Sequence, residues 1–150
     1  MELSELYSQK ILDLAGNTQQ PPRLEHAGGS ARNVSRVCGP VVEVDVAIEN
    51  GVITAYGHAV SACALGQTSA AVVAREIVGT PVGAFRQLRD QMHAMLKDNG
   101  AAPTGKWSDL GYLEPVREYP ARHMSTLLVF EAVVAAIEKA ESTESVGVVA

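Results

Sequence analysis

Cationic residues are in short supply in this chain. Its 150 residues include 12 lysines and arginines against 17 aspartates and glutamates, a formal net charge of −5, and the basic residues are scattered. Nucleic acids attract clustered positive charge, so we expect no nucleic-acid partner. The longest apolar runs also fall well short of the ~20 residues that cross a bilayer, so we expect no membrane association.

Cysteine is scarcer still, because Cys38 and Cys63 are the only two. Residues 1–5 are acidic, unlike the basic start of a secretory signal peptide. We therefore expect a cytoplasmic protein in which both thiols stay reduced. Composition alone also allows two plainer interpretations, a structural disulfide or two inert core thiols.

Several chemistries lack their sequence signals. The glycine-rich stretch 27–30 follows no predicted strand and opens no clear helix, so a phosphate-binding loop is not expected. No base is placed near either thiol, as a Cys/His hydrolase would need. The length, with 47% hydrophobic and 19% charged residues, fits one globular domain. We expect this domain to span 1–140, followed by a flexible polar tail at 141–150.

A hairpin is the clearest local feature. Two alternating apolar runs, 41–49 and 52–60, flank an Asn-Gly pair, whose residues accept the positive φ angles of a two-residue turn. This register, carried to the strand ends, places Cys38 opposite Cys63, and opposed residues have Cβ atoms about 5 Å apart. Pro40 cannot donate to the ladder and marks a bulge or the strand end. The sequence thus predicts two thiols close together where the sheet ends.

The same register assigns faces to other residues. His58 falls opposite Glu43 on the polar face, where a cross-strand pair needs no metal. Cys63 directly precedes a predicted helix, and a helix N-terminus favours the anionic thiolate that binds metals.

Periodicity and turn residues place the remaining elements. Helices are predicted near 3–14, 64–78, 82–95 and 127–137, a first strand near 31–37, and loops at 18–30 and 100–105. Strands come first and most helices follow. We therefore expect the α+β class, with a small antiparallel three-stranded sheet and helices packed on one face.

Six segments together resemble the U-type iron–sulfur cluster scaffold proteins, the family of IscU, SufU and the NifU N-terminal domain. Residues 38–39, the hairpin, 62–63 and 67–70 resemble its Cys-Gly-Asp, hairpin and Gly-Cys pattern before a helix of small residues. Residues 109–111 and 119–122 resemble the SufU branch, which inserts a segment before an aromatic-Pro-x-Arg motif. The resemblance covers almost the whole chain and implies a SufE/NifU-like fold.

The chain departs from the family ligand set of one aspartate and three cysteines at two positions. Pro40 stands in place of the aspartate, and Ser125 in place of the third cysteine. The resemblance implies that Cys38 and Cys63 are metal ligands and sulfur acceptors. A tetrahedral zinc ion or a [2Fe–2S] cluster takes four protein donors, so two donors are missing.

Candidates for the missing donors follow from their chemistry. His123 is one, because imidazole replaces thiolate in zinc and some iron–sulfur sites; its plainer interpretation is a solvated histidine. Ser125 is another, with helix N-capping as its plainer interpretation. Met124 offers a weaker thioether donor. A homodimer is a further source, since two pairs of Cys38 and Cys63 supply four thiolates.

The resemblance implies a scaffold or carrier for iron–sulfur cluster assembly. A cysteine desulfurase would pass persulfide sulfur to the protein, iron would bind, and a labile [2Fe–2S] cluster would go on to apo iron–sulfur recipient proteins. No small substrate is turned over, so we expect a non-enzymatic scaffold. Two alternatives stay open: a zinc-binding sulfur-relay partner of a desulfurase, and a divergent paralogue that acts as a binding or regulatory module.

Overall fold

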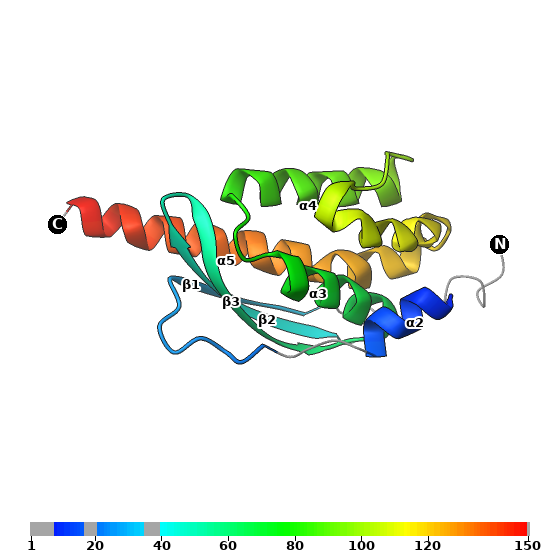
Figure 1. The fold of residues 1–150 in the computed structure, drawn as a ribbon, viewed down its shortest axis with the longest axis horizontal. Coiled ribbons are helices and arrows are strands. Elements are labelled where there is room, and N and C mark those ends of the chain that lie inside the picture. The colour runs from blue at the N-terminus through cyan, green and yellow to red at the C-terminus, as the bar shows by residue number, and fades with distance from the viewer. Residues whose placement is uncertain (1–7, 17–20, 35–39, 150) are drawn as a thin grey trace.

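The computed structural model describes residues 8–16, 21–34 and 40–149, with side chains through residue 142 (Figure 1). The elements in chain order are α2 (Gln9–Gly16), β1 (Gly29–Val34), β2 (Val41–Glu49), β3 (Val52–Ser61), α3 (Ala64–Glu76), α4 (Val82–Lys97), the 3₁₀ segments η1 (Gly105–Glu118) and η2 (Pro120–Arg122), and α5 (His123–Val149). The sequence did not predict the two 3₁₀ segments as such.

The three strands form one antiparallel sheet in the order β1-β2-β3. Asn50 and Gly51 have φ angles of 52° and 75°, as the Asn-Gly turn requires. A bulge follows directly, because Ile48 pairs with Ile53 but the next ladder pair leaves Thr54 as an extra residue. One inserted residue exchanges the two faces of the strand beyond it.

The bulge corrects the predicted register. Val44, and not Glu43, lies opposite His58. His58 therefore faces the core, where it is 2% exposed, and its Nδ1 lies 2.8 Å from the Tyr56 hydroxyl. The expected cross-strand pair of a histidine and a glutamate on the polar face does not form.

The same correction affects the two thiols. The β2–β3 ladder ends with Val41 paired to Ser61, so it stops before Cys63 and in a register shifted from the predicted one. Beyond the bulge, the register that placed Cys38 opposite Cys63 no longer applies. Because Cys38 lies outside the described residues, the proximity of the two thiols stays a prediction.

α5 is the central helix of the core. It packs against β1 and β2, and a Cβ at Gly29 would collide with the backbone carbonyl of Ala136. The stretch Pro120–Ser142 is long and apolar enough to cross a membrane, yet 67% of its tested window is buried inside the fold, as in a core helix. Helices on one face of a small antiparallel sheet confirm the predicted α+β class.

The C-terminal segment 141–150 was expected to be a flexible tail. α5 continues as a helix to Val149, and Glu141 forms an ion pair with Arg86 of α4. The boundary at 140 and the flexibility of the tail stay predictions.

The other face of the sheet carries a polar cluster around Asp45, which is 2% exposed. Arg23 donates from Nε and Nη2 to the two carboxylate oxygens at 2.5 and 2.9 Å. Ser30 Oγ and the Leu24 amide donate to the same carboxylate at 2.6 and 3.0 Å. A carboxylate that accepts several charge-assisted bonds holds its partners firmly, so the cluster fastens segment 21–24 across the sheet.

These donors, Arg23 first, hold the pKa of Asp45 at about 2, below its ordinary 3.8. Because the pKa is lower in the folded state, the cluster stabilises the protein fully above about pH 4 and loses this contribution as the pH falls toward 2. We predict that Asp45→Asn lowers the free energy of unfolding at neutral pH by roughly 1.5–3 kcal/mol and flattens its acid dependence.

Urea unfolding at several pH values measures both effects. Glu43→Gln is the matched control, because Glu43 also binds Arg23 but its side chain is 35% exposed; we expect a loss of at most about 0.5–1 kcal/mol. An unchanged acid slope in Asp45→Asn would contradict the prediction.

Candidate functional site

Cys63 occupies the N-cap position of α3, with φ −69° and ψ 174°. Its thiol is free and partly buried, and no side chain caps the helix. The Cys63 carbonyl accepts the Gln67 amide at 2.9 Å, which starts the helix at this residue. The unpaired amides of a first turn favour an anion, so the predicted position of Cys63 at a helix N-terminus is confirmed.

Hydroxyl groups fix the first turns of α3 against two other helices. Thr68 Oγ1 lies 3.1 Å from the Ile11 carbonyl of α2, as well as 2.8 Å from the carbonyl one turn back. Ser69 Oγ donates to the Thr126 carbonyl of α5 at 2.8 Å, in a buried position. The start of α3 is thus held in place relative to both neighbours.

The start of α5 lies directly beside the start of α3. A Cβ built on Gly66 would come within 3.2 Å of the Ser125 carbonyl and 2.9 Å of the Ala62 Cβ. Glycine therefore allows the two helix starts to approach closely. The structure brings Ser125 to the same end of the molecule as Cys63, as the family pattern implied.

Ser125 has an unusual environment for a serine. It is 2% exposed, and its Oγ is buried without a hydrogen-bond partner in the part of the chain that the structure describes. α5 begins at His123, so Ser125 lies inside its first turn. Ser125 is therefore not the N-cap residue that its plainer interpretation predicted. A buried hydroxyl without a partner needs an explanation, and a ligand is one.

His123 is buried, in contrast to the solvated histidine of its plainer interpretation. Its Nε2 donates toward the carbonyls of Val116 and Arg117 at 3.1 and 3.3 Å. A neutral imidazole that donates from Nε2 keeps its lone pair on Nδ1, so only Nδ1 is left for a metal. The contacts of Nε2 tie the start of α5 to the end of η1.

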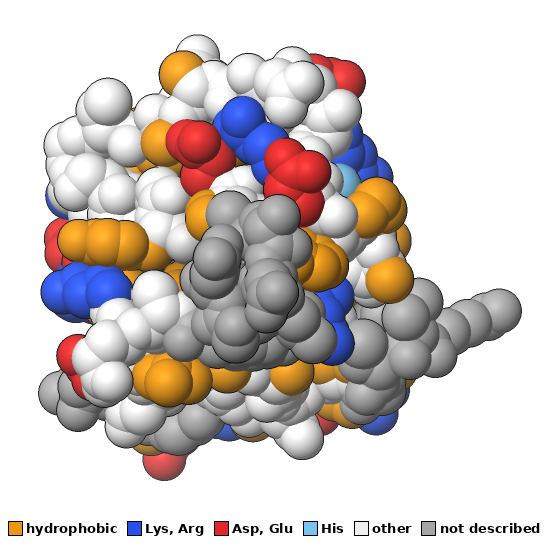
Figure 2. Space-filling view, turned by 90° about the vertical axis from the view of Figure 1, so that its right-hand side faces the viewer, with side chains coloured by type: hydrophobic (Ala, Val, Ile, Leu, Met, Phe, Trp, Pro, Cys, Tyr) orange, Lys and Arg blue, Asp and Glu red, His pale blue; other side chains and the backbone are white. Residues whose placement is uncertain are grey.

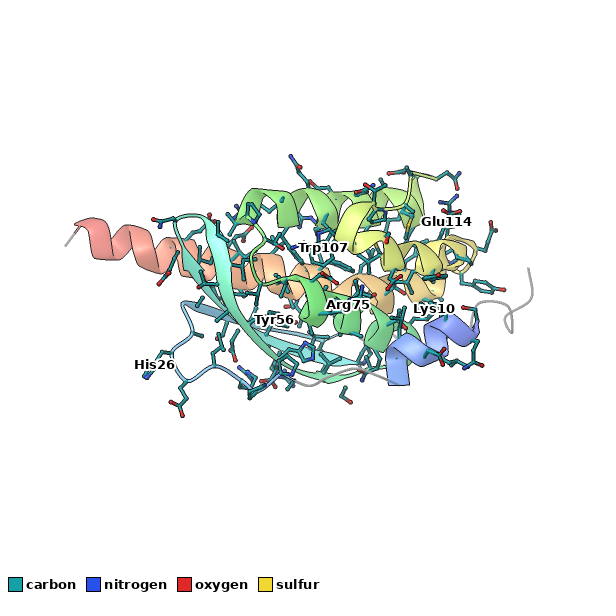
Figure 3. All side chains as sticks on the ribbon, in the orientation of Figure 1. Lys10, His26, Tyr56, Arg75, Trp107 and Glu114 are labelled. Atoms are coloured by element: carbon teal, nitrogen blue, oxygen red, sulfur yellow. The ribbon has the colours of Figure 1, made fainter. Side chains whose placement is uncertain are left out.

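Of the other predicted positions, some lie within the described residues and one does not. Cys38 lies outside it. Pro40 is buried just before β2 and offers no carboxylate, and Met124 is 48% exposed. His26, which was not a predicted site residue, lies on the exposed loop, away from the end where Lys10 marks α2 (Figure 3). Among the described residues no three His, Cys, Asp or Glu side chains gather as a metal site.

Some large hydrophobic residues at the end of the molecule formed by α2, η1 and the start of α5 are exposed. Figure 2 shows hydrophobic side chains exposed there among acidic and basic ones. Leu12 and Tyr112 are each 46% exposed. The roles of Thr68 and Ser69 were not predicted from the sequence, although two successive hydroxyl residues before an apolar run of alanines and valines are a usable signal of packing against other backbones.

Comparison with known proteins places this geometry in a family. No family model matches the chain, and no curated protein matches it significantly. Its structure is similar to that of a nitrogen-fixing NifU-like protein (N-terminal) from Brucella abortus, with 43% identity, 93% of this chain and 97% of that chain covered, and a TM-score of 0.90.

A second solved structure is an assembly scaffold protein assigned to the SUF iron–sulfur system of Fervidobacterium islandicum AW-1. It shares 18% identity, with 90% and 98% of the two chains covered and a TM-score of 0.79, and at this identity the likeness shows the fold alone. The Brucella match spans nearly the whole of both chains and confirms the resemblance seen in the sequence. The chain belongs to the NifU-like, U-type iron–sulfur scaffold family.

Proposed function

We propose that this protein is a non-enzymatic scaffold or carrier for iron–sulfur cluster assembly. It accepts sulfur from a cysteine desulfurase, binds iron, and passes a labile [2Fe–2S] cluster to apo recipient proteins in the cytoplasm. The observation that carries the proposal is the free thiol of Cys63 at the N-terminus of α3, in a chain 43% identical to a NifU-like protein. The cluster is cargo, so a weak ligand set suits its release.

The donor set is Cys38, Cys63 and Ser125, with His123 Nδ1 or a second subunit as the remaining donor. Thiolates are the soft ligands that iron–sulfur clusters select. Ser125 supports the proposal because its buried hydroxyl has no partner in the described part of the chain. A hydroxyl binds iron less strongly than a thiolate, so replacing the third cysteine by serine favours loss of the cluster over retention.

Sulfur transfer requires a nucleophilic thiolate. The Cys63 thiolate attacks the terminal sulfur of the desulfurase persulfide, the S–S bond of that persulfide breaks, and the desulfurase cysteine leaves as a thiolate. Cys63 then carries the persulfide, and no external oxidant or reductant is needed. The first-turn amides of α3 stabilise the anion before and after the transfer.

We predict that Cys63→Ser removes sulfur acceptance at position 63 and prevents cluster binding. After incubation with a cysteine desulfurase and cysteine, mass spectrometry of the peptide that contains position 63 should show one added sulfur in the wild type and none in the variant, which keeps Cys38 as a second acceptor. Anaerobic reconstitution with ferrous iron and sulfide should give visible charge-transfer absorption only in the wild type.

The alternatives appear as distinct outcomes of this experiment. Stoichiometric zinc and persulfide without a cluster would support the zinc-binding sulfur relay. No persulfide, iron or cluster on the wild-type protein at any protein concentration would leave the binding or regulatory paralogue, and the scaffold proposal would fail.

Substitutions at Ser125 separate stability from cargo binding. Ser125→Ala removes a buried hydroxyl without a described partner, so we expect an equal or higher free energy of unfolding, by up to about 1–3 kcal/mol. The same change should shorten the half-life of the reconstituted cluster, whereas Ser125→Cys should lengthen it several-fold. Thermal unfolding and the decay of visible absorption measure the two effects.

Ser69→Ala is the matched control, because Ser69 is a buried serine whose hydroxyl is bonded to the Thr126 carbonyl. It should lose stability by about 1–3 kcal/mol, since the carbonyl loses its donor. If Ser125→Ala and Ser125→Cys both keep the wild-type cluster half-life, Ser125 is not a donor.

A further inference from the structure

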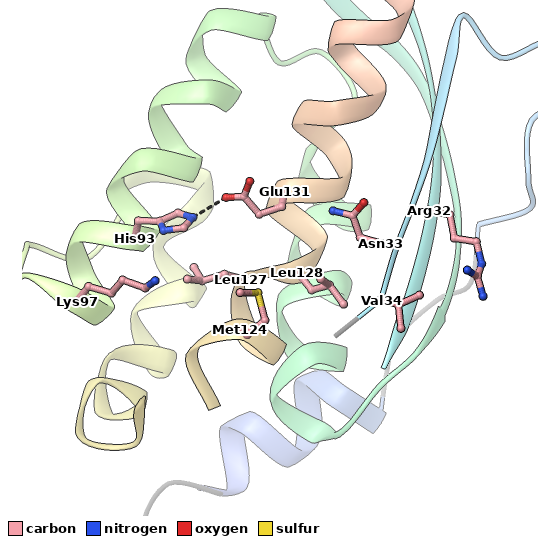
Figure 4. Close-up of a pocket in the computed structure, with 9 residues that line it drawn as sticks. All are labelled: Arg32, Asn33, Val34, His93, Lys97, Met124, Leu127, Leu128 and Glu131. Atoms are coloured by element: carbon pink, nitrogen blue, oxygen red, sulfur yellow. Dashed lines mark hydrogen bonds and ion pairs between the residues drawn. The ribbon is translucent and has the colours of Figure 1, made fainter. Parts of the chain in front are cut away.

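A groove of about 500 Å³ opens between β1, α4 and α5 (Figure 4). We call it the β1–α5 groove. The side chains that define its character are Arg32, Val34, Lys97, Met124, Leu127 and Leu128. It lies beside the proposed site, because Met124 directly precedes Ser125, but it contains none of the proposed donors.

The floor of the groove is apolar and partly open to water. Val34 and Met124 are each 48% exposed, and they lie next to the buried Leu127 and Leu128. Covering exposed apolar surface is favourable because it removes that surface from water. An uncovered apolar floor of this kind marks a site of contact with another molecule.

Two cationic residues line the groove, Lys97 on α4 and Arg32 on β1, and Figure 4 shows the Arg32 guanidinium on the side of β1 that faces away from α5. Lys97 extends from the last turn of α4 and has no ion-pair partner among the residues that the structure describes. Arg32 on β1 has a 61% exposed side chain, and its acidic neighbour Glu43 lies 3.4 Å away. Glu43 also binds Arg23 at 2.6 Å, so it neutralises Arg32 only in part.

The acidic residue in the lining is already paired. Glu131 lies 2.5 Å from His93 Nε2 and 3.4 Å from an Arg89 nitrogen. Its carboxylate is therefore already occupied by two side chains. The lining thus holds two cationic residues and one paired carboxylate, in a chain whose net charge is −5.

We propose that the β1–α5 groove binds an acidic segment of a partner protein. In this arrangement one large aliphatic side chain of the segment covers Val34 and Met124, while carboxylates on either side of it pair with Arg32 and Lys97. Arginine and carboxylate match in geometry, and the apolar floor excludes water around the pairs. The inference does not rest on cluster binding, because none of these residues is a proposed donor.

The test selects ligands without assuming the partner. A display library of random short peptides is panned against the full-length protein, with Arg32→Glu/Lys97→Glu as the counter-selection. We expect enrichment of peptides in which Leu, Ile or Met is flanked by Asp or Glu. The selected peptide should shift the methyl NMR signals of Val34, Met124, Leu127 and Leu128.

Affinity variants separate the charged and apolar parts of the groove. Arg32→Glu/Lys97→Glu should raise the Kd of the selected peptide at least about tenfold, and Met124→Ser about threefold or more. Lys139→Glu is the matched charge reversal on the exposed surface of α5, outside the lining, and should change the Kd by less than about twofold. Affinity should also fall as salt is added.

Three results would overturn the proposal. One is that the selected peptides share no pattern of acidic residues around an aliphatic one. Another is that the selected peptide shifts methyl signals outside the groove, or that its Kd is the same for the wild type and for Arg32→Glu/Lys97→Glu. The third is concentration-dependent methyl shifts of the free protein together with a dimer in sedimentation, which would make the groove an interface between two copies. Cluster reconstitution of Arg32→Glu/Lys97→Glu, expected to match the wild type, tests the scaffold function separately.

Discussion

Ser69 Oγ donates to the Thr126 carbonyl at 2.8 Å in the buried contact between α3 and α5, and the position of Cys63 depends on this bond. Buried hydroxyls and carbonyls are stable only when paired, so neither helix can rotate here without leaving a polar group unpaired. Gly66 keeps the two helix starts in contact, because any larger residue would meet the Ser125 carbonyl. The thiol therefore extends from a fixed helix end, which suits the role proposed for it as sulfur acceptor and metal ligand.

Two serines at this junction differ in a way that separates structure from function. The Ser69 hydroxyl donates to the Thr126 carbonyl, and its loss would remove this buried hydrogen bond. Ser125 is equally buried, yet its hydroxyl has no partner within the described residues, so the fold gains nothing from it. Under the proposed function, the buried hydroxyl of Ser125 is explained by what it does for a ligand. Strained or unsatisfied groups gather at functional sites for this reason.

Local sequence patterns predicted where the helices and strands lie better than they predicted the register between the strands. Asn50-Gly51 determined the turn, because few other pairs accept positive φ at both positions. The bulge at Thr54 had no local signal. The backbone of Ile53 bonds to Gly79 and Thr80, at 2.8 and 2.9 Å, in the chain that leaves α3. Pairing with such a distant segment is a tertiary contact, and it changed the face of His58 while the propensities of the strand stayed the same.

The positions of charged residues in the sequence also do not reveal which charges the fold brings together. The basic residues are scattered along the chain, and from this scatter we expect no nucleic-acid partner. Folding nevertheless brings Arg32 of β1 and Lys97 of α4 to one apolar groove, while Glu131 is paired by its neighbours. Net charge governs long-range attraction, but a short acidic segment responds to the field within about one Debye length, roughly 8–10 Å. A protein with a negative net charge can therefore hold a local site for carboxylates of the kind proposed for the β1–α5 groove.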